Sequence, residues 1–315
     1  MKNVTKILIA AALCTAIFAN QRIDALGGDS GFWPGDRDNI SSFPAAINDH
    51  SFLEMDNVGS DANNTTATIL WGDDTKWGFS YDVADADSWF NLMWGNGDMG
   101  LTFSYTSATT DSNDDGTDGM AIGYGQNFSW GELGAGFTSA GDATTTWANW
   151  RGDLGCWVFS NAKAGLSMWD DGGDNSSMGL GFDMWTNMDA GGANVLFAMG
   201  FGYSSNDDAA GNQTTMTLPA VTIAVEGDLT DWATVRGFVN ADYTISASND
   251  GYAGDDAVAD GYTGSTYAYG FGLGFNWGQL SADIGISEDL FQDPFGAMTG
   301  YDDLTTSEVT LSWSF

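Results

Sequence analysis

Alternation between large apolar residues and small or polar residues is the feature that most constrains this chain. It recurs in many segments from about residue 51 to the C-terminus, where the intervening positions are Gly, Ala, Ser, Thr, Asn or Asp. In the clearest segment, residues 269–277, glycine or asparagine alternates with Tyr269, Phe271, Leu273, Phe275 and Trp277. Successive side chains of a β-strand point to opposite faces, so this period of two residues predicts strands.

The small face of these strands distinguishes two kinds of all-β fold. A soluble β-sandwich turns Lys, Glu and Thr to water, whereas this face is mostly Gly and Ala, and the 315-residue chain has only 8 Lys and Arg. The pattern predicts an all-β transmembrane antiparallel up-and-down β-barrel over residues 51–315, with about 14 strands and roughly 12 to 16 as the range. Residues 144–169 leave the number open, because they divide into two or three strands. A soluble secreted β-helix or lectin-like fold is the alternative.

Trp-Gly pairs repeatedly end an alternating segment just before a tight turn. They occur at Trp71, Trp94, Trp130 and Trp277. Tryptophan is enriched where a membrane protein meets the headgroup region. We therefore expect these four residues to form a membrane girdle, although Trp-Gly also ends hairpins in other β proteins.

The remaining connections are longer and acidic. They cover residues 107–119, 170–177, 204–213, 247–262 and 288–303. Short turns at one end and long polar loops at the other are typical of outer-membrane barrels. Acidic loops at one mouth would attract cations.

The last strand ends the chain on an aromatic residue. Its large residues are Val309, Leu311, Trp313 and Phe315. This ending resembles the C-terminal signature by which bacterial barrels are recognised for membrane assembly. It predicts the barrel-assembly machinery and outer-membrane lipid as partners.

The first 19 residues predict a secretory signal peptide. Lys2 and Lys6 form a positive region, residues 7–18 form a short apolar region, and we expect cleavage after Ala19. The apolar region is too short for a stable membrane-spanning helix. The expected location is therefore the bacterial outer membrane.

Residues 20–50 show no alternation and precede the first strand. They contain Ala-Leu-Gly-Gly at 25–28, an acidic step at 36–40 and Phe-Pro-Ala-Ala at 43–46. These steps resemble the N-terminal region of the FadL-type long-chain fatty-acid transporter family. The resemblance implies a small hatch inside a 14-stranded barrel and hydrophobic-ligand transport. Phe43 departs from the Asn usual in that family. We expect residues 20–50 to be a periplasmic, plug-like segment; a tail that only leads into the first strand is the alternative.

Residues 111–116 contain the first half of a calcium-binding loop. Asp111, Asn113 and Asp115 supply oxygen ligands at alternate positions, and Gly116 follows. Ile122 stands where a complete EF-hand loop has its bidentate Glu. Calcium is thus one interpretation, and a solvated acidic loop is the other; no other cofactor is expected.

Four charged residues fall on the polar face of their strands. They are Asp183, Arg236, Asp242 and Asp283. A closed barrel would turn them into the lumen, where they would either tune ion selectivity or form a structural network.

Catalysis and nucleic-acid binding are both poorly supported. The only histidine is His50, and no Gly-x-Ser-x-Gly motif is present, so no enzymatic activity is expected. A net charge of -35 leaves too few cations to neutralise phosphates along a groove. Cys156, beside Trp157, is predicted to be a small packed residue.

Three functions remain open from the sequence. The first is a porin-like channel for small solutes with a mild cation preference. The second is FadL-like transport of hydrophobic ligands, which predicts a lateral opening or a kinked strand. The third is a structural or assembly barrel without an open pore. Gly and Ala on the lumen face fit either a narrow pore or a lumen filled by residues 20–50.

Overall fold

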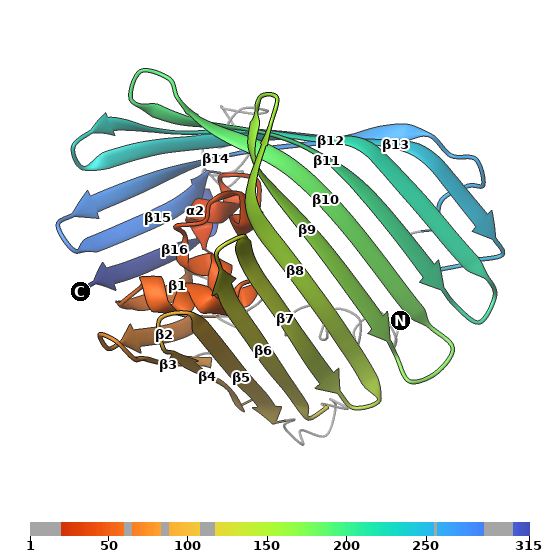
Figure 1. Ribbon diagram of the computed structural model, residues 1–315, viewed down its shortest axis with the longest axis horizontal. Helices are drawn as coiled ribbons and strands as arrows, with labels where there is room; N and C mark the ends of the chain where they lie inside the picture. Colours follow the sequence, from red (N-terminus) through yellow and green to blue (C-terminus); the bar gives the residue numbers. More distant parts are fainter. Residues whose placement is uncertain (1–19, 60–64, 83–87, 108–116, 255–256, 287–304) are drawn as a thin grey trace.

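A computed structural model describes residues 20–59, 65–82, 88–107, 117–254, 257–286 and 305–315. Within these residues, sixteen antiparallel strands form one closed barrel, so the predicted fold class is confirmed and the strand number lies at the upper end of the expected range. Figure 1 shows the strands following one another around the barrel. The strands are β1 (Phe52–Gly59), β2 (Thr66–Trp71), β3 (Lys76–Asp82), β4 (Ser88–Gly95), β5 (Met99–Ser107), β6 (Gly119–Phe128), β7 (Gly131–Ala140), β8 (Ala143–Cys156), β9 (Phe159–Asp170), β10 (Ser176–Asp189), β11 (Ala193–Asp207), β12 (Asn212–Thr230), β13 (Ala233–Asp250), β14 (Gly264–Trp277), β15 (Leu280–Ile286) and β16 (Thr305–Ser314).

Pairing of the first and last strands closes the barrel. β1 pairs with β16 from Phe52 opposite Ser314 to Gly59 opposite Glu308. Residues 144–169, which the sequence divided into two or three strands, belong to β8 and β9. The barrel has two strands more than the central expectation, because strands as short as β2 and β3, with 6 and 7 residues, carry little periodicity.

The exterior is apolar, whereas the lumen-facing residues are mostly small or polar, apart from the apolar residues that contact residues 20–50. On β1, the side chain of Leu53 is 48% exposed, whereas that of the adjacent Glu54 is 2% exposed. On β16, Trp313 is exposed and Ser312 is buried. A continuous apolar exterior of this kind fits a lipid environment.

The two ends of the barrel differ in their connections. At one end, which we call the turn end, each even-numbered strand joins the next strand through two to four residues. The other end, the loop end, has connections of unequal length. Two segments that the sequence marked as long connections, 170–177 and 204–213, leave only five and four residues between strands, so that prediction is wrong there, because the strands extend further than their alternation indicated; other connections at this end are longer. The connection between β13 and β14, for example, spans 13 residues.

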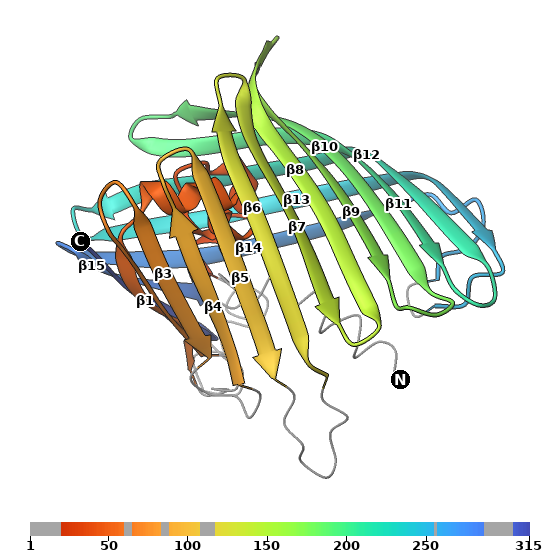
Figure 2. The same cartoon turned by 60° about the horizontal axis from the view of Figure 1, so that its bottom comes forward.

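Strand length divides the barrel into two walls. Strands β8 to β14 have 12 to 19 residues and form what we call the long wall. Strands β1 to β7, β15 and β16 have 6 to 10 residues and form the short wall. Figure 2 shows the long strands extending beyond the short ones.

Residues 20–50 fold into short helical turns inside the barrel, and we call them the plug (Figure 1). The turns are α2 (Gln21–Asp24), η1 (Ser30–Phe32), η2 (Arg37–Ser41) and η3 (Pro44–Asp49). No helix in the described chain is long and apolar enough to cross a membrane. Two buried apolar clusters join the plug to the walls: Ile40 and Ile47 pack with Leu70 of the short wall, and Leu26 packs with Trp185 of the long wall.

Candidate functional site

The lumen near the turn end is occupied by the plug, which an ion network ties to the long wall. The Arg22 guanidinium donates to both carboxylate oxygens of Glu226 at 2.9 Å and also pairs with Asp36 of the plug. Glu226 Oε2 accepts from Arg236 Nε at 2.5 Å, and Arg236 Nη1 donates to Asp283 Oδ1 at 2.5 Å. The strand register explains the contact between Glu226 and Arg236, because Glu226 on β12 lies directly opposite Arg236 on β13.

A second ion pair ties the plug to the short wall. Arg37 in η2 pairs with Glu54 on β1, whose side chain is almost completely buried. The guanidinium also lies over the ring of Phe52, 5.4 Å from its centroid. A carboxylate buried this deeply depends on its partner, because an unpaired buried charge costs several kcal/mol.

Arg151 on β8 holds the middle of the plug. Its Nε donates to Glu132 Oε2 at 2.7 Å, and its Nη1 donates to Asn39 Oδ1 of the plug at 2.6 Å. Its guanidinium stacks over the ring of Phe43, 4.2 Å from the centroid. Phe43, where the FadL-type family usually has Asn, is thus part of the cation–π contact.

Lys163 makes the corresponding contact from the neighbouring strand, β9. Its ammonium group pairs with Asp29 of the plug, lies 3.6 Å from Asp183 Oδ2 and sits 3.8 Å from the centroid of Phe32. Arg151 and Lys163 are directly opposite each other in the β8–β9 pairing. Five of the eight Lys and Arg residues of the chain therefore form ion pairs where the plug meets the barrel wall. They are Arg22, Arg37, Arg151, Lys163 and Arg236.

The plug contains a buried carboxyl group, that of Asp38, which favours the protonated form. Burial raises the pKa of Asp38 well above its ordinary value, and the negative charges of Asp36 and Glu54 raise it further. Its Oδ1 has no hydrogen-bond partner among the described residues. Nearby, burial lowers the pKa of the His50 imidazole. Both shifts favour neutral side chains in the tightly packed plug.

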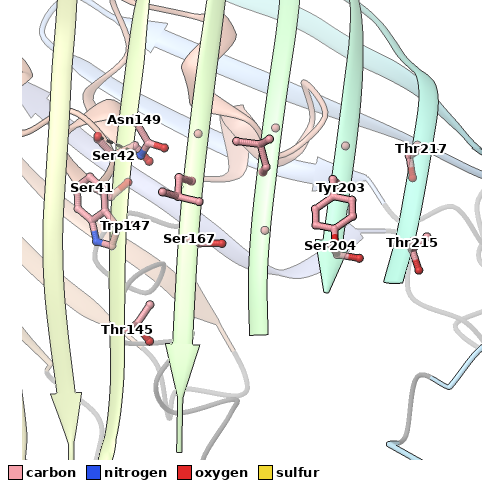
Figure 3. Close-up of a pocket in the computed structure, with 16 residues that line it drawn as sticks. Ser41, Ser42, Thr145, Trp147, Asn149, Ser167, Tyr203, Ser204, Thr215 and Thr217 are labelled. Atoms are coloured by element: carbon pink, nitrogen blue, oxygen red, sulfur yellow. Dashed lines mark hydrogen bonds between the residues drawn. The ribbon is translucent and has the colours of Figure 1, made fainter. Parts of the chain in front are cut away.

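A cavity of about 520 Å³ lies on the loop-end side of the plug, against the long wall (Figure 3). Two rows of lumen-facing residues across β8 to β12 form its wall. The first, which we call the glycine row, pairs in register as Asn149, Gly165, Gly181, Gly202 and Thr217. The centre of this row has no side chains.

The second row lies one step nearer the loop end, and we call it the serine row. Its residues pair as Trp147, Ser167, Gly179, Ser204 and Thr215. Figure 3 shows Trp147 and Asn149 at one end of the cavity and Thr215 and Thr217 at the other. The two rows thus form a trough with polar ends and an open middle.

Trp147 and the plug close one end of this trough. A Cβ atom at Gly136 on β7 would overlap the Trp147 indole, so the glycine lets the ring lie against the wall. Ser41 and Ser42 of the plug also line the cavity, and Asn149 Nδ2 donates to the Ser42 carbonyl at 3.4 Å.

Two further cavities lie along and beyond the plug. One of about 250 Å³ shares Ser42, Asn149 and Gly181 with the first cavity and reaches Lys163 and Asp183. Another of about 710 Å³ is at the turn end and is lined by plug residues and by the C-terminal residues of the chain. Plug residues line both large cavities, so the plug lies between them.

The structure places the four predicted lumen charges in different environments. Arg236 and Asp283 are buried in the plug-holding network, and Asp183 lies beside Lys163. Asp242 lies opposite Ala220 and is exposed. A role of these residues in ion selectivity stays a prediction.

The predicted girdle and assembly residues lie on the barrel exterior or at its edge. Trp71, Trp130 and Trp277 are exposed and Trp94 is half-buried, and all four lie at the turn end. Leu311, Trp313 and Phe315 are exposed, whereas Val309 is half-buried. Membrane anchoring and recognition during assembly stay predictions.

Two other sequence hypotheses have different outcomes. Asp111, Asn113 and Asp115 lie outside the described residues, so calcium binding there stays a hypothesis. Cys156 is exposed at the end of β8, so the prediction that it is packed is wrong. It lies next to the turn that leads into β9, where the wall has no neighbouring layer to cover it.

Sequence reasoning missed Glu226, Arg22, Arg151, Lys163 and Trp147. The scarcity of Lys and Arg was a usable signal, because a cation retained in so acidic a chain is expected to have a specific partner. No local pattern, however, shows which carboxylate meets which cation.

Comparison with known proteins supports the fold. No protein-family model and no curated protein matches the sequence. A bacterial polysaccharide outer membrane secretin superposes with a TM-score of 0.51 at 12% identity, over 84% of this chain and 97% of that chain. A loop L8 deletion mutant of OmpT from Vibrio cholerae gives 0.46 at 11% identity, over 84% and 94% of the chains. A porin gives 0.45 at 12% identity, over 84% and 99%. The secretin likeness shows a shared barrel fold; none of the comparisons shows a link to the FadL-type family.

Proposed function

We propose that this chain is an exported barrel of the bacterial outer membrane through which small solutes pass, with a mild preference for cations. The observation that carries the proposal is a closed barrel with an apolar exterior and a cavity on each side of its plug, the turn-end cavity lined mainly by polar groups and the loop-end cavity by hydroxyl and amide groups among apolar surface. The apolar exterior suits lipid, and the polar lumen suits hydrated solutes. The likeness to an outer-membrane secretin adds support for the location.

The proposed route follows the long wall. The cavity of about 520 Å³ opens beside β8 to β12 and shares lining residues with the cavity of about 250 Å³. The smaller cavity reaches Lys163 and Asp29, which join wall and plug. A small displacement of the plug at this ion pair would extend the route toward the turn end.

The proposed cation preference comes from the loop end. Exposed carboxylates there include Asp170, Asp207, Asp250 and Asp260, in a chain of net charge -35. Carboxylates at a pore mouth raise the local concentration of cations and lower that of anions. The effect weakens as salt increases, because exposed charges are screened.

Hydrophobic-ligand transport is a second candidate, supported by one specific feature. The pairing of β12 with β13 shifts in register between Thr217 and Ala220, and the pairing of β11 with β12 shifts between Gly200 and Gly202. An irregular ladder is where a lateral opening would form. The lining of the loop-end cavity is more apolar than polar in area, which also suits this candidate, whereas its hydroxyl and amide groups suit hydrated solutes.

Swelling of liposomes that contain the refolded mature chain, residues 20–315, tests the proposal. Sugars and charged solutes of graded size are compared, with a variant that lacks residues 20–49 as the second sample. We expect size-limited entry in the mature chain and a larger size limit after deletion. No entry in either sample would overturn solute passage and favour hydrophobic-ligand transport or a structural barrel.

Reversal potentials measure the cation preference separately. A bilayer containing the protein is placed in a salt gradient of potassium chloride, whose two ions have similar mobilities. We expect a potential of the sign that cation selectivity requires, which shrinks at high salt. A potential of zero or of opposite sign would overturn the cation preference and leave solute passage standing.

We also propose that the C-terminal strand directs assembly into the membrane. Phe315 is exposed at the end of the chain, and its backbone N–H donates to the Ser51 carbonyl at 3.2 Å. Deletion of Phe315 should reduce the fraction of chain inserted in cells, while the detergent-refolded barrel still forms. Equal insertion of the shortened chain would contradict the assembly role.

A further inference from the structure

The loop-end cavity is neutral in a strongly acidic protein. The chain has 43 Asp and Glu residues, yet none of the described residues that line this cavity is Asp, Glu, Lys, Arg or His. A cationic ligand would therefore find no carboxylate to pair with. An anionic ligand would find no cation there and would first meet the acidic loop end.

Hydroxyl and amide groups supply the polar contacts of the cavity. Asn149, Ser167, Ser204, Thr215 and Thr217 come from four different strands of the long wall, and each side chain can both donate and accept hydrogen bonds. Ligand hydroxyl groups also donate and accept. An apolar ligand would leave these side chains without partners, which is costly when water is displaced.

The trough also has one flat apolar surface. Trp147 lines it, and its indole is held against β7 by the absence of a side chain at Gly136. The C–H groups on one face of a pyranose ring are apolar, while the hydroxyl groups around the ring are polar. A sugar ring can therefore pack on an indole and still use its hydroxyl groups for hydrogen bonds.

The middle of the trough is wide enough for more than one ring. It crosses five strands, which corresponds to about 19 Å at an inter-strand spacing of about 4.8 Å. A Cβ atom at Gly181 would meet nothing within 4 Å, and one at Gly202 would meet only Thr217 Cβ, at 3.7 Å. The glycine row therefore leaves open space between the polar ends.

We propose that the trough formed by the glycine row and the serine row is a binding site for a short neutral oligosaccharide. One sugar ring packs on Trp147 beside Asn149, and the following rings extend over the glycines toward Thr215 and Thr217. This inference deepens the proposed solute passage and rests on it for its role, because a site at the loop end would select solutes before they reach the plug.

Isothermal titration calorimetry of the refolded mature chain in detergent tests the site without requiring passage. The probes are the neutral trimers of α-1,4-glucose, β-1,4-glucose and β-1,4-N-acetylglucosamine, with the anionic trimer of galacturonic acid for comparison. We expect at least one neutral trimer to bind, and the anionic trimer to bind at least about tenfold more weakly, a difference of about 1.4 kcal/mol.

Three variants locate the binding. Trp147→Ala removes the stacking surface and Gly181→Val fills the open middle, so each should weaken binding at least about tenfold, or by about 1.4 kcal/mol. Trp147→Phe keeps an aromatic surface and should retain most of the affinity. Trp150→Ala is the control, because Trp150 lies on the same strand but faces the barrel exterior. All four variants are first checked for the folded barrel by circular dichroism.

The possible results separate this proposal from the proposed transport. No binding of any neutral trimer, equal binding of the anionic trimer, or unchanged binding in Trp147→Ala or Gly181→Val would overturn the carbohydrate site. Binding without liposome swelling would retain the site and overturn solute passage. Swelling without binding would retain passage and overturn the site.

Discussion

Lumen-facing glycines have different surroundings in different parts of the barrel. On the short wall, a Cβ atom at Gly100 would overlap the Pro44 carbonyl, and one at Gly125 would overlap the backbone of Ala45. On the long wall, a Cβ atom at Gly181 would enter open space. Toward β14 of the same wall, however, a Cβ atom at Gly272 would overlap Ala25 of the plug. Glycine thus lets the plug touch the short wall and β14, and it leaves a cavity along β8 to β12.

The difference follows from where the plug is held. η3 packs against β4 to β7 of the short wall, whereas Lys163 holds Asp29 at a side chain's length from the long wall. Backbone contact needs glycine on the wall, because any side chain would push the plug away. The contact between Lys163 and Asp29 is made through side chains, so it leaves space between the plug and the long wall. The loop-end cavity is part of that space.

The largest expected effect is at Arg37, which ties the plug to the short wall. Arg37→Met leaves Glu54 buried without a partner and should lower the free energy of unfolding by about 3–5 kcal/mol. Denaturant unfolding of the refolded barrel measures this. The double variant Arg37→Met/Glu54→Gln should recover much of the loss, because it removes the unpaired charge. A single variant as stable as the natural chain would contradict the role of this ion pair.

A smaller effect should separate the two sets of glycines directly. Gly100→Val forces the plug away from the short wall and should cost about 1–3 kcal/mol. Gly181→Val adds a side chain to open space, so the unfolding midpoint should hardly change. The comparison uses the same substitution on both walls. Equal losses in the two variants would show that the walls do not differ in the way described.

The pH dependence of stability should report on the buried plug. The pKa of Asp38 is raised by burial and by neighbouring negative charges, so the plugged barrel holds this proton above the ordinary carboxyl pKa of about 4. In that window the folded state binds more protons than the unfolded chain, and the free energy of unfolding falls as pH rises. Asp38→Asn should flatten this part of the dependence, measured by unfolding midpoints between about pH 4 and about pH 8. Identical slopes in the two chains would contradict it.

The smallest expected effect is at the turn end, where both walls carry exposed tryptophans. Trp71 belongs to the short wall and Trp277 to the long wall. If both lie in one membrane girdle, Trp71→Phe and Trp277→Phe should each cost less than about 1 kcal/mol in lipid, because an aromatic ring remains. Unfolding in lipid and in detergent is compared. A loss that is equal in the two media would argue against the girdle.

Much of the barrel could be predicted from residue pattern. Alternation identified the strands around residues 99–105, 178–184 and 269–277, and it separated the apolar exterior from the polar lumen, because both depend on neighbouring residues. The number of strands was less certain, because β2 and β3 are too short to show a clear period. The candidate site was largely missed: Trp147, Gly181 and Thr217 share a trough only through the register of β8 to β12.

Sequence by itself determined which faces of the strands meet lipid and which line the lumen, because a period of two residues fixes side-chain direction without reference to the rest of the chain. It also marked residues 20–50 as different from the strands. Only the tertiary structure decided which lumen glycines are covered. Pro44 meets Gly100, and Ala45 meets Gly125, across long separations in sequence. These contacts depend on how the closed barrel holds its plug, and that arrangement leaves the trough on the long wall open.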